Sequence, residues 1–405
     1  MPKLAFFYAT FPRPTETFVR RELRAINQLD LSPRIYSIWG GAKHWEGIQV
    51  YRFSCWKLYS VLFWLPYWAW RKPSAFCDVL KTLWHRPCPN IQNWNETFLG
   101  LGFALVEARR VESEGFEALH AVWATMPATA AYALSRLIDV PFSMGAHAYD
   151  LFRRGGDWML PEKLNHASMI RTSSKSSSRR LYAMGMNKEK VQVIRRGLCH
   201  WPKRSSFELI KPLHLELISV GRLVEKKGYF LLLRILFELM KRGKCDFRMN
   251  IVGGGPLANK LDAEIHRYGL VEKVNLLGSK SEEEVRDLFL RADAKLFTGI
   301  IGSNGDRDGI PNVIPEAMSA GCLILASHHA GASEAFTDGS SGYSLNPVNF
   351  HEWVEILESF ANYPTSFRKI RKNAQLHARE RFDVRNTARL LVSNFEEMFI
   401  ENDSA

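Results

Sequence analysis

Two carboxylates stand eight positions apart in the run DRDGIPNVIPEAMSAG, residues 306–321. A glycine and a proline interrupt the run, and we expect a helix to begin at Asn312 or Val313. The start of a helix presents backbone N–H groups and the positive end of its dipole, which suit phosphate oxygens. Asp308 and Glu316 would then accept hydrogen bonds from hydroxyl groups attached to that phosphate. The pattern indicates a nucleotide sugar, and the alternative is a surface loop before an ordinary capped helix.

Two cations follow the strand that is expected to open the second half of the chain. Arg222 and Lys227 stand in SVGRLVEKKG, residues 219–228, between an apolar strand and a helix. Both side chains should reach the carboxyl end of that strand, where arginine offers a planar fork to phosphate and lysine a mobile point charge. Together they would neutralise a diphosphate leaving group. A solvated turn rich in Lys and Arg is the common alternative.

Three consecutive glycines, residues 253–255, follow the next expected strand within VGGGPL. Glycines allow close approach of the backbone, and the run is similar to a nucleotide-approach loop, which makes Gly254 a candidate donor-binding residue. Neither this run nor the first strand–helix junction, residues 11–17, has the spacing G-x-G-x-x-G. The sequence therefore argues against a nicotinamide-dependent enzyme.

The elements that must position these residues alternate between short apolar strands and helices, which is typical of a parallel α/β sheet. In the first half we expect a helix over residues 16–29 and strands over 4–8, 34–38, 118–123, 141–145, 168–172 and 191–194. In the second half we expect helices over 227–241, 256–268 and 282–290 and strands over 215–220, 247–252, 274–277, 294–297 and 322–326.

The polar stretch 200–214 contains two prolines and is the best candidate for a linker between two domains. We therefore expect two Rossmann-like α/β domains, over residues 1–205 and 206–380, that face a central cleft. Residues 381–405 should form a helix that crosses back to the first domain. Ligands in such folds bind beyond the carboxyl ends of the strands.

Residues 51–98 depart from this pattern because they hold six of the twelve tryptophans of the chain. An apolar stretch, residues 58–70, has basic residues on both sides and is too short to cross a bilayer. Tryptophan beside Lys and Arg suits an element that lies on an anionic membrane surface. The alternative, given equal weight, is an inserted helical hairpin that packs its aromatic side chains into the core.

Charge and cysteine content limit the class of protein and its compartment. The net charge is +12, and residues 1–200 hold 27 Lys and Arg against 15 Asp and Glu. A basic first half is expected to meet an anionic partner, such as acidic lipid or a phosphorylated substrate. The six cysteines form no C-x-x-C pair, and we expect reduced packing residues in a cytoplasmic protein, with peripheral membrane association open.

These motifs in this order resemble the retaining GT-B glycosyltransferases of family 4, particularly those of bacterial exopolysaccharide assembly such as colanic acid. SVGRLVEKKG, VGGGPL, LGSKS and DGIPNVIPEAMSAG carry the resemblance in the second domain. FPRPTETFVRREL and GAHAYDLF carry a thinner one in the first. The resemblance implies transfer of a sugar from a nucleoside-diphosphate donor to a saccharide hydroxyl, without a metal or other cofactor. A lipid-linked acceptor is the implied setting.

The resemblance also assigns roles to individual residues. Glu316 would hold the ribose hydroxyls of the donor, and Asp308 would hold hydroxyls of the transferred sugar. Arg222 and Lys227 would bind the diphosphate. The backbone of residues 309–312 would approach the sugar and diphosphate, which adds Gly309, Ile310 and Asn312 to the donor-binding set.

The chain departs from the family at two places. The usual E-x7-E signature reads D-x7-E here, because Asp308 replaces the first glutamate and reaches about one methylene less far. Asp306, Arg307 and Asp308 also spell D-x-D, which elsewhere suggests a metal-bound diphosphate, but the two cations make a metal unnecessary. Residues 197–199 read Gly-Leu-Cys where relatives usually carry an aspartate after the glycine, and no physical account of that change is evident.

The first domain offers candidates for catalysis and for the acceptor side. His147 follows the strand expected over 141–145 and should emerge at the cleft, where the resemblance gives it a hydrogen bond to the donor sugar. Asp150 is expected to cap the next element. Thr15, Glu16 and Thr17 could cap the first helix, which is the simpler interpretation, or approach the sugar from the N-terminal loop. Thr15 and Thr17 are therefore candidates for the acceptor side.

Two other functions remain open from the sequence. One is a related nucleotide-sugar epimerase or hydrolase. The other is a basic protein that binds membrane or nucleic acid without catalysis. Its only support is the net charge of +12, and the chain has no helix-turn-helix or RNP-like motif, so no nucleic-acid partner is expected.

Overall fold

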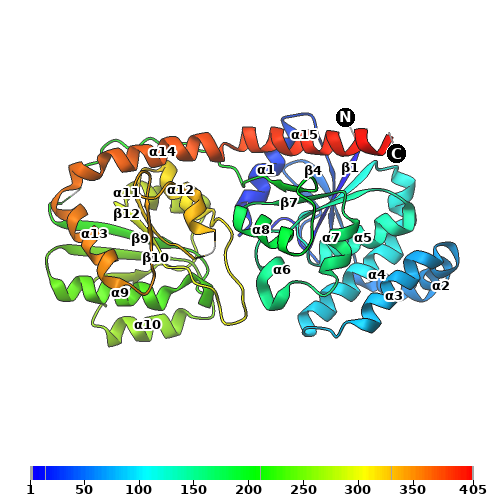
Figure 1. Cartoon of the computed structure of the whole chain (residues 1–405), viewed down its shortest axis with the longest axis horizontal. Coiled ribbons are helices and arrows are strands. Elements are labelled where there is room, and N and C mark those ends of the chain that lie inside the picture. The colour runs from blue at the N-terminus through cyan, green and yellow to red at the C-terminus, as the bar shows by residue number, and fades with distance from the viewer. Residues whose placement is uncertain (1–2, 14, 210, 330, 404–405) are drawn as a thin grey trace. The chain divides into compact units, whose positions relative to one another are not determined.

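In the computed structural model, the apolar runs predicted as strands form two separate sheets (Figure 1). The central strands are buried along their whole length, as in parallel sheets that carry helices on both faces. The structure describes residues 3–13, 15–209, 211–329 and 331–403. The predicted α/β class with two parallel-sheet domains is confirmed.

The chain divides into two units. Unit 1 comprises residues 1–195 and 384–405, and unit 2 comprises residues 196–383. The stretch 200–214 that was expected to link two domains therefore lies within unit 2, as does residue 205. The last helix, α15 (Val384–Asp403), belongs to unit 1.

Unit 1 contains an eight-stranded sheet with the order β3-β4-β2-β1-β5-β6-β7-β8. All neighbouring strands are parallel except β3 and β4, which form an antiparallel hairpin. The strands are β1 (Leu4–Tyr8), β2 (Arg34–Ser37), β3 (His44–Trp45), β4 (Ile48–Arg52), β5 (Ala118–Ala121), β6 (Phe142–Gly145), β7 (Met169–Thr172) and β8 (Val191–Val193).

Helices cover both faces of this sheet. Along β1, Ala5 and Phe7 face one core and Phe6 faces the other, as the period of two in a strand requires. α4 (Ile91–Glu114) and α5 (Met126–Ile138) pack on the first face, and α1 (Thr17–Asn27) and α15 pack on the second (Figure 1). The remaining helices of unit 1 are α2 (Val61–Arg71), α3 (Pro73–His85), α6 (Tyr149–Phe152), α7 (Leu160–His166) and α8 (Lys175–Ala183).

Unit 2 contains a six-stranded sheet, parallel throughout, with the order β11-β10-β9-β12-β13-β14. Because every strand runs the same way, the loops that follow the strands gather at one edge. The strands are β9 (His214–Val220), β10 (Asp246–Val252), β11 (Val274–Leu276), β12 (Ala294–Phe297), β13 (Leu323–Ser327) and β14 (Tyr343–Leu345).

The helices of unit 2 also form two layers, which Figure 1 shows below and above the sheet. α9 (Tyr229–Arg242), α10 (Ala258–Arg267) and α13 (Phe350–Asn362) bury their apolar side chains against one face. α11 (Glu282–Arg291), α12 (Val313–Ser319) and α14 (Arg368–Phe382) cover the other. The layers leave the carboxyl edge of the sheet to the loops after β9, β10, β12 and β13.

The tryptophan-rich segment forms a short turn at Cys55–Ser60, then α2, α3 and the first part of α4. Only Trp68 of its six tryptophans is buried. The alternative that the segment packs its aromatic side chains into the core therefore holds for one face of α2 and fails for the exposed tryptophans of the segment. In the described residues, no helix combines the length and the apolar composition needed to cross a bilayer. None of the six cysteines forms a disulfide; Cys245 and Cys322 are buried, whereas Cys77 and Cys199 are exposed and are not packing residues.

Candidate functional site

The candidate site of unit 2 is built by two loops at the carboxyl edge of its sheet. The first, residues 221–228, follows β9, and the second, residues 298–312, follows β12, its neighbour. The loops are in direct contact at Gly228, where a Cβ atom would lie 1.9 Å from the carbonyl oxygen of Thr298. Gly228 also has a φ of +66°, so glycine is required there on both counts.

Three consecutive residues of the first loop bind the second loop. The carboxylate of Glu225 accepts hydrogen bonds from the backbone N–H and the hydroxyl of Ser303, both at 2.9 Å. The carbonyl of Lys226 accepts one from the Ile300 N–H at 2.9 Å. The side chains of Lys226 and Lys227 then reach further along the same loop. The loop after β12 is therefore held at the edge of the sheet by specific polar contacts.

The lysine–aspartate cluster, formed by Lys226, Lys227, Asp306 and Asp308, is the centre of the site. Lys227 Nζ donates to Asp308 Oδ2 at 2.6 Å. Lys226 Nζ donates to Asp306 Oδ1 at 3.0 Å and lies 3.4 Å from Asp308 Oδ1. The side chains of Lys226, Lys227 and Asp308 are at most 15% exposed, so these pairs are only weakly screened by solvent.

The electrostatics of the cluster keep Asp308 ionised. Burial raises the pKa of Asp308, but the ammonium groups of Lys227 and Lys226 outweigh burial and hold that pKa below its ordinary value. Arg222 differs from the two lysines because it is exposed. Among the described residues its guanidinium has no ion-pair partner, so it is available to an incoming anion.

The helix that follows the second loop begins where the sequence predicts, at Val313, with Asn312 at its N-cap. It offers fewer amide donors than expected. Residues 311 and 315 are prolines, and the Ile314 N–H already bonds the carbonyl of Pro311 at 3.0 Å. An anion seat here would depend on the amides of the loop itself, at Gly309, Ile310 and Asn312. Glu316, in the first turn of α12, is half-buried.

The three-glycine loop after β10 is explained in part by packing between loops. A Cβ atom on Gly253 would lie 2.0 Å from the carbonyl oxygen of Gly221, and one on Gly255 would lie 2.5 Å from that of Leu223. These two glycines allow the loops after β9 and β10 to pack backbone to backbone. Gly254 is exposed, and its Cβ would meet only the Ser279 hydroxyl, at 3.0 Å. Gly254 is thus the member of the run that a ligand could approach.

In unit 1, His147 follows the carboxyl end of β6 and is buried, at 4% exposure. Its ring packs edge-on against Trp123, with ring centroids 5.3 Å apart. Asp150 fixes the backbone here, because its carboxylate accepts hydrogen bonds from the N–H groups of His147 at 3.0 Å, Ala148 at 2.7 Å and Ala124 at 3.3 Å. The prediction that Asp150 caps the next element is wrong, because α6 has Ala148 at its N-cap and no side chain that caps it, and Asp150 lies inside that helix.

Of Thr15, Glu16 and Thr17, the three residues expected as possible caps of the first helix, only Glu16 lies at the N-cap position. α1 has Glu16 at its N-cap, and no side chain there accepts a capping hydrogen bond. The Thr17 hydroxyl instead accepts a hydrogen bond from Arg21 at 3.1 Å, one helical turn later. Thr15 is exposed. Their role on the acceptor side stays a prediction.

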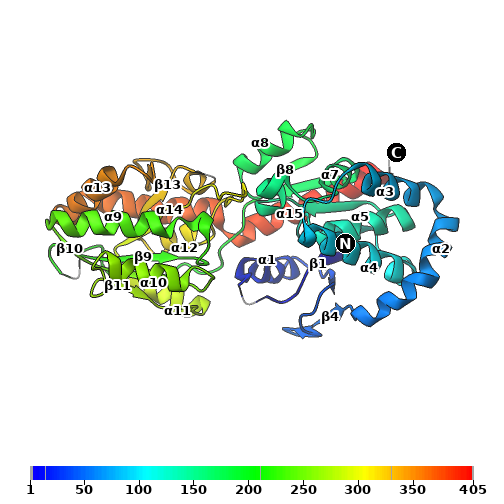
Figure 2. The ribbon, with the colours of Figure 1, turned by 90° about the horizontal axis from the view of Figure 1, so that it is seen from below.

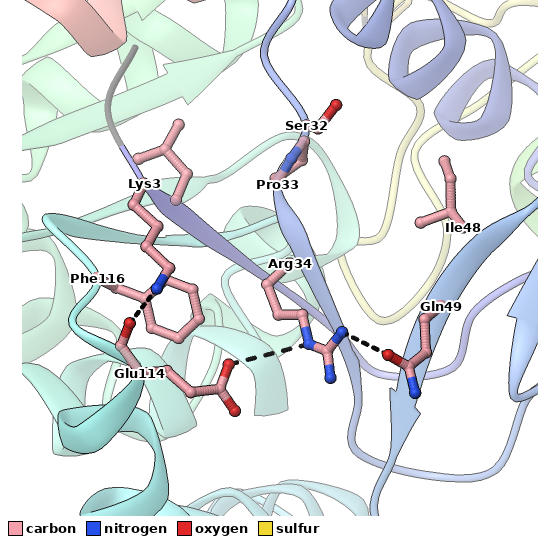
Figure 3. A pocket seen from close by; sticks show the side chains of 9 residues that line it. Lys3, Ser32, Pro33, Arg34, Ile48, Gln49, Glu114 and Phe116 are labelled. Atoms are coloured by element: carbon pink, nitrogen blue, oxygen red, sulfur yellow. Dashed lines mark hydrogen bonds and ion pairs between the residues drawn. The ribbon is translucent and has the colours of Figure 1, made fainter.

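A separate cavity of about 400 Å³ opens in unit 1 at the amino ends of β1, β2 and β4. Figure 3 shows Arg34 between Glu114 and Gln49, with its guanidinium 3.9 Å from the carboxylate and 2.9 Å from the amide oxygen. Open parallel sheets bind ligands at the other edge, beyond the carboxyl ends of the strands. The position of this cavity therefore gives no reason to place the functional site there.

Sequence reasoning missed two lysines of unit 2. The sequence analysis names Lys227 as a candidate and not its neighbour Lys226, because nothing in the pattern EKKG shows that both side chains face the loop after β12. Lys295, on β12, is fully buried, and its Nζ donates to the carbonyl of Leu296 at 3.0 Å. Burial, helped by the charge of Lys227, lowers the pKa of Lys295 to about 7.

Both carboxylates of the D-x-D run, residues 306–308, form ion pairs with lysines. Among the described residues, no three His, Cys, Asp or Glu side chains gather closely enough to hold a metal ion. The expectation that the site works without a metal stays a prediction.

Comparison with known proteins agrees with this geometry. Residues 206–377 match the family model of glycosyl transferases group 1. The chain is 36% identical over 201 residues to a putative colanic acid biosynthesis glycosyltransferase, WcaL, of Salmonella typhimurium; the match covers 49% of this chain and 46% of that protein. It is 34% identical over 166 residues to the amylovoran biosynthesis glycosyltransferase AmsK of Erwinia amylovora, covering 40% of each. The chain spans about half the length of the curated relatives it matches.

A solved structure extends the comparison to the whole fold. HepE of Anabaena, in complex with UDP and glucose, superposes with a TM-score of 0.71 at 17% identity, over 98% of this chain and all of that one. At this identity the similarity shows the fold alone, which is GT-B with two Rossmann-like units. The match to the glycosyl transferases group 1 model covers residues 206–377 and does not extend to the first half of the chain.

Proposed function

We propose that this chain is a retaining glycosyltransferase of family 4 that moves a hexose from a nucleoside-diphosphate donor, a UDP-sugar, to a hydroxyl of a saccharide. Its setting would be bacterial exopolysaccharide or cell-envelope glycan assembly. The observation that carries the proposal is the lysine–aspartate cluster, which puts cations for a diphosphate and a carboxylate for hydroxyls within 2.6–3.4 Å of each other. The homology to WcaL and AmsK supports the setting.

In this proposal Arg222 and Lys227 bind the diphosphate. The ammonium of Lys227 has three N–H donors, so it can keep its bond to Asp308 and still donate to phosphate oxygens. Asp308, ionised and held by two lysines, accepts hydrogen bonds from hydroxyls of the transferred sugar. Glu316 binds the ribose, and the backbone at Gly254, Gly309, Ile310 and Asn312 approaches the donor.

The reaction breaks the bond between the anomeric carbon and the phosphate oxygen and forms a bond from that carbon to the acceptor oxygen on the same face. The acceptor proton passes to the departing phosphate oxygen, so the products are a glycoside and a nucleoside diphosphate. The transition state has oxocarbenium character, with negative charge growing on the diphosphate. Fixed cations at that charge contribute most to the rate.

His147 acts in this proposal on the donor sugar, by hydrogen bonding that stabilises the transition state. Support comes from its position at the carboxyl end of β6 and from the three hydrogen bonds by which Asp150 fixes its segment. Thr15 and Thr17 stand as candidates for contact with the acceptor. We propose that this acceptor is lipid-linked and that the enzyme needs no metal.

A thermal-shift screen against UDP, GDP and ADP and their common sugars tests the donor. Turnover with the best donor should then fall about 10²-fold or more in Arg222→Ala, since one charge-stabilising contact is lost. Arg248→Ala is the matched control, because Arg248 is an exposed arginine of β10 in the same unit. Near-normal turnover in Arg222→Ala would contradict the proposal.

Incubation with labelled donor alone separates transfer from the rival chemistries. A transferase releases product at speed only when an acceptor is present, whereas an epimerase or hydrolase converts the donor without one. Salt-sensitive binding to duplex DNA with no donor binding would instead favour a non-enzymatic basic protein.

A further inference from the structure

Unit 1 exposes an apolar surface that the proposed chemistry does not use. In the described part of the chain, eleven of the twenty exposed large hydrophobic side chains fall within residues 56–98, which is about a tenth of the sequence. Soluble proteins rarely expose contiguous apolar patches of this kind unless the patch binds something. We call the centre of this surface the aromatic face: Trp56, Tyr59, Leu62, Phe63, Trp70 and Trp84.

The fold holds the aromatic face outward. On the inner side of α2, Trp68 is fully buried, and its indole N–H donates to the carbonyl of Leu105 in α4 at 3.0 Å. Trp64 and Tyr67 lie on the same side and pack against the core of unit 1. Because successive residues of a helix turn by about 100°, Leu62 and Trp70 must then lie on the opposite side.

The outer side of α2 carries no polar residue. Leu62, Phe63 and Trp70 are 67–85% exposed, and Leu65 and Pro66 complete that side. In α3, Leu80 and Trp84 are also exposed and stand one helical turn apart, with Trp84 88% exposed. Figures 1 and 2 both place α2 at the outer edge of unit 1, away from the central strands of its sheet.

Basic residues border the aromatic face. Residues 55–86 hold five Lys and Arg against one acidic residue, Asp78. Four of the five also pair with carboxylates of neighbouring helices: Lys57 with Glu107, Arg71 with Glu112, Lys72 with Asp139 and Arg86 with Glu162. The attraction of this border for an anion is therefore modest, and apolar contact must supply most of the affinity.

We propose that the aromatic face binds the surface of an anionic lipid bilayer, with α2 lying in the plane of the interface. Tryptophan and tyrosine suit the headgroup region because their rings are apolar and their N–H and O–H groups remain in contact with water. A basic border complements acidic headgroups. A symmetric pairing with a second copy would bring two basic borders together, which disfavours that occupant.

Vesicle flotation of the 405-residue chain tests the inference. The protein should float with phosphatidylcholine vesicles that contain phosphatidylglycerol and bind pure phosphatidylcholine more weakly. In the triple variant Leu62→Ser, Trp70→Ser, Trp84→Ser, partition onto anionic vesicles should fall by about tenfold or more, with an unchanged thermal midpoint. Tyr363→Ser is the matched control, since Tyr363 is 66% exposed but lies in unit 2.

Three outcomes would overturn the inference. They are no flotation with anionic vesicles, flotation that the triple variant leaves unchanged, and a dimer in light scattering that the triple variant abolishes without any flotation. The last result would assign the face to a second copy of the chain. Membrane binding does not require sugar transfer, so a protein that floats but transfers nothing would contradict only the proposed function.

Discussion

Lys226 and Lys227 both bind Asp308, but replacing one or the other by methionine should have different effects on stability and on nucleotide binding. Methionine keeps the apolar stem of the side chain and removes the charge. Lys226 is the more buried of the two and bridges both aspartates of the cluster. We expect Lys226→Met to lower the stability of unit 2. We expect Lys227→Met to weaken binding of the nucleoside diphosphate, with a smaller effect on stability.

The distances set the size of the first effect. At an effective dielectric constant of about 20, a unit charge pair at 3.0–3.4 Å interacts with about 5 kcal/mol. Much of this is offset by the cost of removing the charges from water, and Asp308 keeps Lys227 when Lys226 is lost. Breaking a buried pair costs about 3–5 kcal/mol when a charge is left unpaired, so a net loss of about 2–4 kcal/mol is expected.

The second effect follows from one charge-assisted hydrogen bond to phosphate. Such a bond contributes about 1.5–3 kcal/mol, so Lys227→Met should weaken the affinity for the nucleoside diphosphate about 10- to 150-fold. The stability should change less, because Lys226 still lies 3.4 Å from the Asp308 carboxylate. Isothermal calorimetry with the nucleotide found in the thermal-shift screen measures this affinity.

Urea unfolding at several pH values measures the stability effect and its origin. The pKa of Asp308 is lowered in the folded protein, so its stabilisation is present above the unfolded pKa and is lost as the pH falls through the folded pKa. The difference between wild type and Lys226→Met should therefore shrink in acid. A difference that is equal at neutral and acid pH would refute the electrostatic reasoning. Lys280→Met is the control, since it removes a surface pair with Glu284 in the same unit.

Three further predictions address other parts of the chain. Lys295→Met should stabilise the protein by up to about 5 kcal/mol below pH 7, since the pKa of Lys295 falls from 10.5 to about 7 on folding. The gain should fade as the pH rises toward 10.5, which urea unfolding at pH values from 6 to about 10 measures. Gly253→Ala should lower the unfolding free energy by about 3 kcal/mol, because its φ is +139° and a Cβ would overlap a carbonyl oxygen. Gly254→Ala should cost little stability but weaken donor binding in calorimetry, and equal costs at both sites would contradict this division. Asp150→Asn should lower kcat about tenfold with little change in the donor KM, since it disturbs the segment of His147; a change in KM alone would speak against it.

The buried strands of both sheets could be predicted because a parallel strand covered on both faces reads as a short apolar run. β1 and β12 have the bounds expected from the sequence, and most other predicted strands differ by one or two residues. The hairpin of β3 and β4 was missed because its turn is Glu46-Gly47, both at positive φ, rather than the usual Asn-Gly or Asp-Gly. β14, which has three residues, was also missed, although the equally short β8 and β11 were predicted.

The sequence predicted where the candidate site lies and most of its charged residues, but not every contact within it. Asp308, Lys227 and Arg222 gather at the carboxyl edge of unit 2 because parallel topology brings the ends of β9 and β12 together. The part played by Lys226 could not be read, since consecutive lysines in a turn give no indication of which one faces a distant loop. The same holds for Gly253 and Gly254, where only the packing of neighbouring loops separates a structural glycine from an accessible one.

The replacement of glutamate by Asp308 has a physical explanation in the lysine–aspartate cluster. A shorter carboxylate lies nearer its own backbone, and Lys226 and Lys227 both reach it from the loop after β9. That loop is in turn bound to the loop after β12 through Glu225 and Ser303. Two lysines restrict the rotamer of a carboxylate more than a single lysine does. Asp308 therefore reaches less far than a glutamate would, but it is a more rigidly held hydrogen-bond acceptor. In the proposed reaction, the hydroxyls of the sugar would then have to approach Asp308 more closely, which would make this position a determinant of sugar specificity.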